Sequence, residues 1–515
     1  MRYSSVCLII FVCFFERVLC AKILAVFPMH GISHYRAGVS LIKILAKAGH
    51  DVTLVSLIGE KEPPKDYKDI ILHGIYNETK YDQVFNRLLN EPDSFWKNCL
   101  HSYSFHKAIL PIVENTLKHE AFQKILNSDE HYDIVLLEDF GTFALHYLGY
   151  HFKAPLILYS GLELSEGMTT FYGNPDNPSY TPKLQSSFGS QMNFLERVQN
   201  IIIYIIAKFI TQSMMIPTQN ELLHKYHPDA PDLNDLIYNT SLLLINSDPS
   251  VYDSLPRIPN IINIAGFHIA KPKPLPKDVQ SILDNAKHGV VYFSLGSNLK
   301  SKFISKEKIE IILRVLSKLK ETVLWKFEED LPGKPDNVII QKWFPQNDIL
   351  AHKNVKLFIS HGGLYSTLES IYHGVPMLCF PFFGDQMSNV KRVERFGLGK
   401  WMKFLELEEE TFEKNIKELL SDPKYSEAAK YRSKLLIDKP ISQAEAVTFW
   451  VDYVIKHKGA DHLKVVQNLS WYQYLLFDVI AFILVCIVSV FIVVKYLLCL
   501  VTRKCKTRNN KVKTN

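Results

Sequence analysis

The chain has 515 residues, of which 47% are hydrophobic and 22% charged, a composition typical of globular proteins rather than of disordered chains. This length exceeds one ordinary hydrophobic core and predicts two or three folded units. The formal net charge is +6, but the last thirteen residues, 503–515, carry six Lys or Arg and no acid. The rest of the chain is therefore near neutral, which disfavours nucleic acid as a partner.

The N-terminus predicts a secretory signal peptide over residues 1–20. Arg2 precedes the apolar run "VCLIIFVCFF" (6–15), and the small-residue pattern "VLC" before Ala21 fits a cleavage site. Two charged residues follow the run closely, which is unusual, so the sequence leaves the cut position open. Such a leader predicts that the body of the protein enters the secretory pathway.

Residues 21–255 predict a first α/β domain. A buried strand (22–28), a helix with apolar residues at helical spacing (35–48) and a second strand (51–56) form a βαβ unit, the building block of a parallel sheet. Gly49 stands where a glycine that ends a helix is expected. Further apolar runs extend the sheet at 134–138, 155–159 and 242–246.

The segment "IIIYIIAKFI" (201–210) is unusually apolar and has two interpretations. It is either a buried helix of the first domain or a surface that dips into a membrane and admits greasy substrates. It is too short for a membrane span, and Lys208 interrupts it.

A proline-rich stretch without clear periodicity, 256–277, is expected to be a linker between domains. Strands then resume within a second α/β domain, 278–440, and most are separated by helix-like segments. They are predicted at 290–297, 323–327, 337–341, 356–360 and 376–380. Two doubly wound, Rossmann-like domains that face each other are the predicted fold, with ligand loops at the carboxyl ends of the strands.

The C-terminus predicts a membrane anchor. Residues 441–470 are expected to form a helical segment that returns toward the first domain, and 471–502 to form one transmembrane helix around the apolar run 479–494. Aromatic residues precede this run and the basic tail 503–515 follows it, which predicts a lumenal body and a cytosolic tail. Two lysines in the last five residues, "KVKTN", resemble a signal for return to the endoplasmic reticulum.

Three Asn-X-Ser/Thr triplets, at Asn77, Asn239 and Asn468, are candidate glycosylation sites of a lumenal body. Which of them are used is left open. Between the two hydrophobic ends the chain has only Cys99 and Cys379, so no disulfide framework is expected.

The stretch "KLFISHGGLYSTLES" (356–370) carries the first candidate chemistry. A strand runs into glycines and a helix start, whose free N–H groups and dipole favour phosphate binding, with His361 as an added donor. Gly363 would let the backbone approach a ligand closely. The alternative is an ordinary capping box of Ser366 and Glu369, which needs no ligand.

Three motifs in this region, "WFPQNDIL" (343–350), "FISHGGLYSTLESIYHGVP" (358–376) and "FPFFGDQ" (380–386), resemble the signature of the UDP-glycosyltransferases. They resemble the insect membrane-bound members more than the vertebrate or plant ones, and weaker similarity covers nearly the whole chain. The resemblance implies a GT-B type fold and a UDP-sugar donor. Plant relatives usually have asparagine where Tyr365 stands, so one phosphate or sugar contact is in doubt.

The resemblance also implies roles for single residues. The uracil would stack on a tryptophan, side-chain amides and a carboxylate would hold the ribose, and the helix start would hold the diphosphate. In this order the residues are Trp343 for the base, Gln346 for the base or ribose, Glu369 for the ribose, His361, Gly363, Ser366 and Ser297 for the diphosphate, and Asp385 and Gln386 for the sugar. Without the neighbouring motifs, Trp343 is equally well interpreted as a core aromatic.

For the chemistry, the resemblance implies His34, rather than His30, as the general base that takes the proton of the acceptor hydroxyl. Its acidic partner should follow the strand 134–138, where Glu138 and Asp139 point to opposite sides. Strand alternation means that only one of them reaches His34, and the sequence leaves the choice open.

The resemblance, together with the predicted leader, anchor and lysine tail, implies an inverting glycosyltransferase of the endoplasmic reticulum that transfers glucose from UDP-glucose to a small hydrophobic acceptor. The choice of glucose as the sugar rests on the likeness to the insect members alone. Phenols, pigments, xenobiotics and steroids fit as acceptors, and attack by oxygen or by carbon stays open. No metal cofactor is expected, because the helix dipole and His361 would stabilise the leaving diphosphate. The alternatives are a glucuronosyl donor, a transferase acting on lipid or protein, and a non-catalytic subunit that binds nucleotide sugars. A homo-oligomer is compatible with each.

Overall fold

The structure, a computed structural model, describes residues 20–29, 31–75, 94–163, 169–175, 177–183, 186, 188–297, 299, 301–465 and 470–512. The chain divides into two compact units, 1–464 and 465–515. Several predicted features lie outside the described residues: residues 1–19 of the predicted signal peptide, His30, and the sequons at Asn77 and Asn468.

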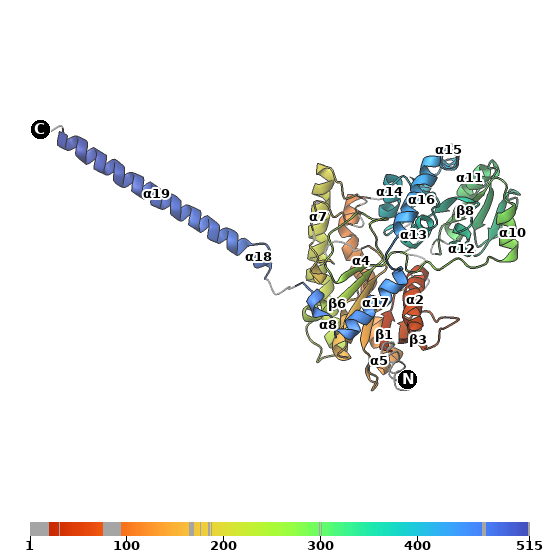
Figure 1. The fold of residues 1–515 in the computed structure, drawn as a ribbon, viewed down its shortest axis with the longest axis horizontal. Coiled ribbons are helices and arrows are strands. Elements are labelled where there is room, and N and C mark those ends of the chain that lie inside the picture. Colours follow the sequence, from red (N-terminus) through yellow and green to blue (C-terminus); the bar gives the residue numbers. More distant parts are fainter. Residues whose placement is uncertain are drawn as a thin grey trace, which may run out of the picture. The chain divides into compact units, whose positions relative to one another are not determined.

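The first sheet occupies the N-terminal half of unit 1 (Figure 1). In the described residues it has seven strands in the order β3-β2-β1-β4-β5-β6-β7, and every pairing is parallel. The strands are β1 (Lys22–Phe27), β2 (Asp51–Ser56), β3 (Tyr67–Ile71), β4 (Ile134–Glu138), β5 (Leu156–Ser160), β6 (Thr240–Ile245) and β7 (Ile261–Asn263). Its helices are α2 (Ile32–Lys47), α4 (Phe95–Lys118), α5 (Glu120–Leu126), α6 (Tyr147–His151), α7 (Phe194–Ile210), α8 (Ile216–Tyr226) and α9 (Leu233–Ile237).

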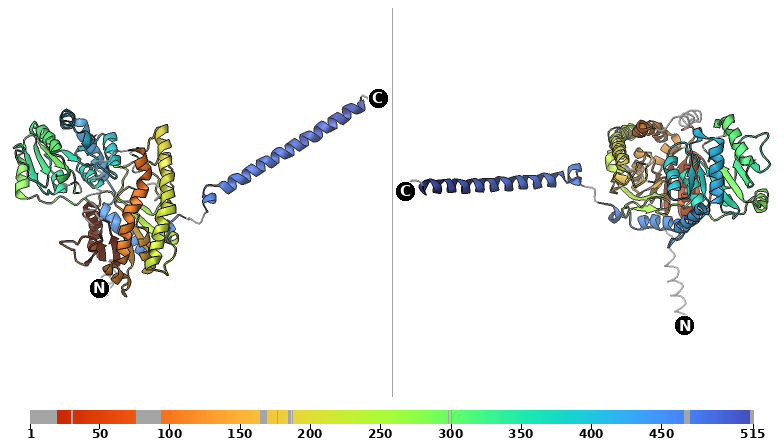
Figure 2. Two further views of the ribbon diagram at one scale, coloured as in Figure 1. Left: turned by 180° about the vertical axis from the view of Figure 1, so that it is seen from behind. Right: turned by 90° about the horizontal axis from the view of Figure 1, so that it is seen from above.

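The second sheet has the same winding. Its six described strands lie in the order β10-β9-β8-β11-β12-β13, again all parallel. They are β8 (Val290–Ser294), β9 (Thr322–Lys326), β10 (Val338–Gln341), β11 (Val355–Ser360), β12 (Met377–Cys379) and β13 (Gly399–Trp401). The helices around it are α10 (Lys277–Asn285), α11 (Lys306–Ser317), α12 (Gln346–Leu350), α13 (Leu364–Tyr372), α14 (Gln386–Arg395), α15 (Glu409–Ser421) and α16 (Pro423–Ile437). Figure 2 shows both sheets with their helices from two further directions.

Each sheet is buried on both faces, which explains why its strands read as continuous apolar runs. In β1, Leu24 and Val26 belong to one hydrophobic cluster, while Ile23 and Ala25 belong to a separate cluster on the other face. Because side chains alternate along a strand, a sheet covered by helices on both sides needs apolar residues at every position. The predicted fold of two doubly wound parallel domains is confirmed.

Three short strands, β3, β7 and β13, were not predicted, because none has a long apolar run. The prediction of a linker over 256–277 is corrected in part: β7 lies inside it and pairs with β6 as the edge of the first sheet. Three residues between prolines carry too little periodicity to reveal a strand, and only pairing with the sheet makes them one. The other predicted domain boundaries stay predictions.

Helix α17 (Gln443–Lys456) follows the second sheet but packs in the first half of unit 1. Val447, Val451 and Val454 are fully buried in the cluster that also holds α2 and one face of β1. Two chain crossings therefore connect the halves, one before α10 and one before α17.

Helix α7 lies beside α4 (Figures 1 and 2). Unlike a helix of an ordinary core, it exposes most of its large apolar side chains. Its inner face buries Asn200, Ile203 and Ala207, while a row of large apolar residues is exposed to solvent. These are Phe194, Leu195, Val198, Ile201, Ile202, Ile205 and Phe209. The interpretation of this segment as a buried helix of the first domain therefore holds only for its inner face.

Unit 2 consists of α18 (Trp471–Tyr474) and the long helix α19 (Phe477–Val512). In the described residues two helical stretches are long and apolar enough to cross a membrane. One is Phe477–Arg503, with mean hydropathy 3.1 and no buried part, and the other is Phe194–Tyr226, with mean hydropathy 1.5 and a buried inner face.

Candidate active site

Several of the predicted site residues follow strands at the two points where strand order reverses. In the first sheet this point lies between β1 and β4, and in the second between β8 and β11. Loops diverge there and leave a crevice at the carboxyl ends of the strands, the usual ligand position in such sheets. His34 follows β1 and Glu138 ends β4, while Ser297 follows β8 and His361 follows β11.

His34 and Glu138 form a direct pair. His34 Nδ1 lies 2.7 Å from Glu138 Oε1, and the carboxylate is buried. Burial lowers the pKa of His34, but the hydrogen bond and charge of Glu138, together with the charge of Asp385, outweigh it, so the pKa of His34 is raised above 6.5. Because a carboxylate only accepts hydrogen bonds, Nδ1 carries the proton and Nε2 presents a lone pair.

Asp139, the other candidate partner, points elsewhere. Its Oδ2 accepts a hydrogen bond of 2.8 Å from the Tyr172 hydroxyl in the interior. Burial raises the pKa of Asp139 to about 6. The sequence left open which of the two acids pairs with His34, and the structure shows that Glu138, and not Asp139, does so.

Trp343 lies at the surface with half of its area exposed, so its interpretation as a core aromatic is wrong. The guanidinium of Arg36, in α2 of the first half, lies 4.3 Å from the centre of the Trp343 ring. The carboxylate of Glu369 also attracts Arg36 electrostatically. The planar guanidinium of Arg36 thus covers a face of the Trp343 ring, on which the base is predicted to stack.

Gln346 links Glu369, the candidate ribose residue, to Ser366, a candidate diphosphate residue. Its Nε2 donates to Glu369 Oε2 at 2.5 Å and to Ser366 Oγ at 3.0 Å. Burial raises the pKa of Glu369 to about 7 despite the opposing effects of Gln346 and Arg36. The capping-box alternative is wrong: α13 begins after Gly363, with no side-chain cap, and Ser366 lies inside the first turn.

His361 is packed between glycines at the predicted diphosphate site. A Cβ on Gly296 would lie 2.7 Å from the imidazole, and one on Gly363 would lie 2.4 Å from it. Burial and the nearby Lys326 lower the pKa of His361 to about 4, and its buried Nδ1 has no hydrogen-bond partner among the described residues. Gly363 is therefore required for the packing of His361 as well as for any close approach of a ligand.

Asp385 is the N-cap residue of α14, at the end of the loop from β12, and Gln386 is the first residue of that helix. Gln386 Oε1 accepts hydrogen bonds from the backbone N–H groups of Phe382 (2.8 Å) and Phe383 (3.2 Å), which closes the loop. A sugar hydroxyl can therefore meet Gln386 only through its amide nitrogen. Burial raises the pKa of Asp385, whose carboxylate also acts electrostatically on His34 across the interface between the halves.

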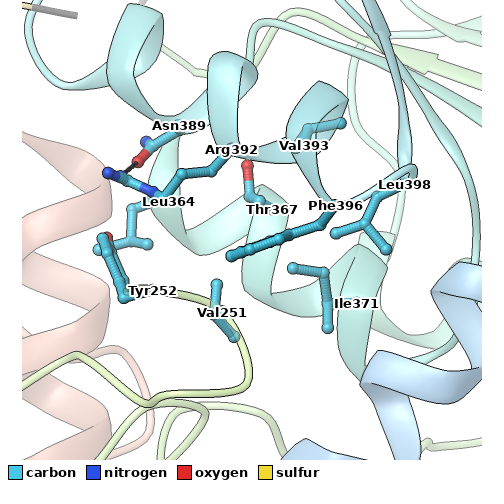
Figure 3. A pocket seen from close by; sticks show the side chains of 10 residues that line it. All are labelled: Val251, Tyr252, Leu364, Thr367, Ile371, Asn389, Arg392, Val393, Phe396 and Leu398. Carbon is cyan, nitrogen blue, oxygen red and sulfur yellow. Dashed lines mark hydrogen bonds between the residues drawn. The ribbon is translucent and has the colours of Figure 1, made fainter. Parts of the chain in front are cut away.

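A second layer fixes Asp385. Asn389 Nδ2 donates to Asp385 Oδ2 at 2.6 Å, and Asn389 Oδ1 accepts from Arg392. Figure 3 shows Arg392 between Asn389 and the ring of Tyr252, over which its guanidinium lies at 4.2 Å. Tyr252 belongs to the segment that leaves β6, so a residue from the first crossing supports the loop of the second half.

Sequence reasoning missed three residues of this site: Arg36, Lys326 and Asn389. Lys326 is a buried lysine at the carboxyl end of β9, and its Nζ donates to the carbonyl of Gly296 at 2.9 Å. Its position as the last residue of an apolar strand run was the available signal. Arg36 and Asn389 gave no such signal, because both lie on helices among other polar residues.

Asn239, the sequon in the described part of the chain, is exposed before β6, and its Oδ1 accepts a hydrogen bond from Lys464. Within the described residues there is no group of three or more His, Cys, Asp or Glu arranged to hold a metal ion. The absence of a metal cofactor stays a prediction.

The sequence was compared with protein families and curated proteins. The profile described as "UDP-glucoronosyl and UDP-glucosyl transferase" matches residues 21–512. A UDP-glycosyltransferase of Dactylopius coccus is 37% identical over 486 residues, 92% of this chain and 91% of the relative. A UDP-glucosyltransferase of the same insect is 35% identical over 93% of this chain and 92% of its own, and a UDP-glucuronosyltransferase of Macaca fascicularis is 30% identical over 97% of each.

Solved structures support the fold. A glycosyltransferase of kitacinnamycin aligns with a TM-score of 0.57, at 15% identity, over 84% of this chain and 99% of its own. CalG4, the calicheamicin glycosyltransferase, aligns with a TM-score of 0.55, at 16% identity, over 84% and 98%. These alignments support a GT-B type fold for the two α/β halves.

Proposed function

Because the chain belongs to the family of UDP-glucuronosyl and UDP-glucosyl transferases, we propose that it is an inverting enzyme that moves glucose from UDP-glucose to a hydroxyl of a small hydrophobic acceptor. The observation that carries this proposal is the His34–Glu138 pair, 2.7 Å apart, which faces Asp385 of the other half. An imidazole and a candidate sugar-binding carboxylate thus meet at one interface.

In the proposed reaction, His34 Nε2 takes the acceptor's proton as its oxygen attacks the anomeric carbon. Glu138 holds the ring through Nδ1 and stabilises the imidazolium that forms. In this proposal the N-terminus of α13 and His361 stabilise the charge that gathers on the leaving diphosphate. Lys326, whose ammonium pairs with Glu328, lies near His361. Attack from the side opposite UDP converts an α-linked donor into a β-glycoside.

The donor is tested with microsomes that express the full chain, supplied with UDP-glucose, UDP-glucuronate or UDP-galactose and a panel of phenols. We expect β-glucosides from UDP-glucose, with the anomeric configuration read by NMR, and undiminished transfer in EDTA. Glucuronides as the main product would replace the proposed donor by UDP-glucuronate, the donor class named for the macaque relative. An α-glycoside would contradict the inverting mechanism.

We further propose that the enzyme is anchored in the endoplasmic reticulum membrane by α19, with unit 1 in the lumen. The apolar span of α19, its basic tail and the terminal lysines support this proposal. The predicted signal peptide and the sequons support the same orientation. The exposed apolar face of α7 supports lipid as a partner of unit 1, because a contiguous row of this kind on a helix suits the bilayer interface.

The lipid contact is tested by replacing Phe209, which is 65% exposed, with tryptophan in the full chain in nanodiscs. We expect the added fluorescence to be quenched by brominated lipids. The matched control is Phe449→Trp, at an exposed phenylalanine on α17 rather than α7. Equal quenching at both positions, or none at 209, would rule out α7 as the contact.

A further inference from the structure

Tyr365 crosses the interface between the halves of unit 1 with its side chain. It lies in the first turn of α13, whose N-terminus faces the proposed diphosphate site. Its hydroxyl lies 3.0 Å from the hydroxyl of Tyr159 on β5 of the first half. The ring of His268 meets its ring edge to face, with centres 5.0 Å apart.

A glycine makes room for this hydroxyl. An ideal Cβ placed on Gly161 would lie 2.6 Å from the Tyr365 oxygen, closer than Cβ atoms approach other atoms in real structures. The same Cβ would lie at ordinary contact distance from the Tyr159 oxygen (3.5 Å) and from His34 Nδ1 (3.7 Å). The backbone of Gly161 is not in the left-handed region, so the missing side chain serves space and not conformation.

The gap adjoins the catalytic pair. Tyr159 is the direct neighbour of Glu138 across the β4–β5 pairing, and Glu138 holds His34. Asn246, at the end of β6, donates to the carbonyl of Gly161 at 3.4 Å and fixes the other side of the gap. The Tyr365 hydroxyl thus lies on the Nδ1 side of His34, behind the atoms that react.

We propose that Tyr365 is a positioning residue that couples the two halves: its hydroxyl, seated in the gap at Gly161 and bonded to Tyr159, holds the donor-binding helix α13 in register with the His34–Glu138 pair. This role rests on the proposed function. It gives the tyrosine a task different from a contact to phosphate or sugar. A side chain without a hydroxyl at position 365 would leave the gap at Gly161 empty and would hold α13 less firmly relative to the His34–Glu138 pair.

The test is a pair of substitutions that correct each other, made in the purified full-length protein. Gly161→Ala places a methyl group against the Tyr365 oxygen and should lower kcat at least tenfold. Tyr365→Phe removes one hydrogen bond, and a lost bond of about 0.5–1.5 kcal/mol corresponds to a roughly twofold to tenfold lower kcat. In the double variant the clash is absent, so its kcat should return to that of Tyr365→Phe.

Two readouts and one control variant separate positioning from mere stability. UDP affinity should stay within twofold in all variants, because the hydroxyl does not face the nucleotide. The acid limb of the pH profile of kcat should move in Tyr365→Phe, because Glu138 adjoins the lost bond. The matched control Tyr425→Phe removes a hydroxyl bonded to Glu418 in the second half and should shift neither kcat nor the limb.

Additive losses in the double variant would overturn the proposal, as would an unchanged kcat in Tyr365→Phe. The same cycle is measured on the thermal unfolding midpoint without substrate, where the double variant should again match Tyr365→Phe. A wild-type chain that binds UDP but transfers no sugar would instead overturn the proposed function together with the positioning role. The thermal unfolding cycle would then still test whether the Tyr365 hydroxyl lies in the gap at Gly161.

Discussion

His34→Ala is expected to abolish most glucosyl transfer while UDP still binds. Removal of a general base lowers kcat by about 10²–10⁴-fold. Among the predicted donor residues, Asp385 acts electrostatically on His34, and Asp385 is assigned to the sugar and not to the nucleotide. Transfer is measured with UDP-glucose and the best phenol of the donor panel, and UDP affinity by calorimetry. Loss of UDP binding as well would show that His34 has another role.

The role of His34 as a base also predicts how activity changes with pH. A base acts in its neutral form, and the pKa of His34 is raised above 6.5, so activity should fall as the pH drops through a value above 6.5. Glu138→Gln keeps the shape but removes the charge that raises this pKa, so the acid limb should move to lower pH and kcat should fall strongly. Asp139→Asn, which alters a bond to Tyr172 in the interior, is the matched control with a mild loss. Equal, mild losses in both variants would refute the pair.

Trp343→Ala is expected to weaken UDP binding about 5- to 150-fold, which corresponds to the ~1–3 kcal/mol of one base stacked on an aromatic ring. The half-exposed indole has no core to stabilise, so the thermal unfolding midpoint should change little. Binding is measured by calorimetry with UDP alone, which keeps the result independent of the acceptor.

Trp401→Ala is the control for this change. Trp401 is another partly exposed tryptophan of the second half, and its Nε1 donates to Glu394 at 2.9 Å. Its replacement should leave UDP affinity unchanged. Arg36→Ala adds a further comparison, because Arg36 covers the indole in the structure and a base must share or displace it. Unaltered UDP affinity in Trp343→Ala would remove the base from this ring.

Most of the secondary structure could be predicted from the periodicity of apolar residues. Strands that are buried on both faces are continuous apolar runs, so β1, β2, β4, β6 and β11 were predicted to within one or two residues at each end. β3 is half-exposed and mixed in polarity, and β7 and β13 have three residues each, so their pairing partners, and not their own residues, make them strands.

The segment 201–210 shows the limit of composition. Its apolar residues were compatible with a buried helix or with a membrane-facing surface, and the helix places one row of them against α4 and the longer row outside. A sequence gives the helical period and therefore the existence of two faces. Which face meets the protein depends on the neighbouring helix, which comes from residues about a hundred positions earlier.

The sequence by itself determined two parallel α/β domains, an apolar C-terminal helix and a short inventory of chemically suitable residues, because these depend on local spacing and on motifs within one stretch of chain. Only the tertiary structure decided that Glu138 rather than Asp139 reaches His34, that Arg36 covers Trp343, and that Tyr365 enters the gap at Gly161. Each of these contacts joins elements far apart in the chain, so it is set by how sheets and helices pack and not by any pattern along the sequence.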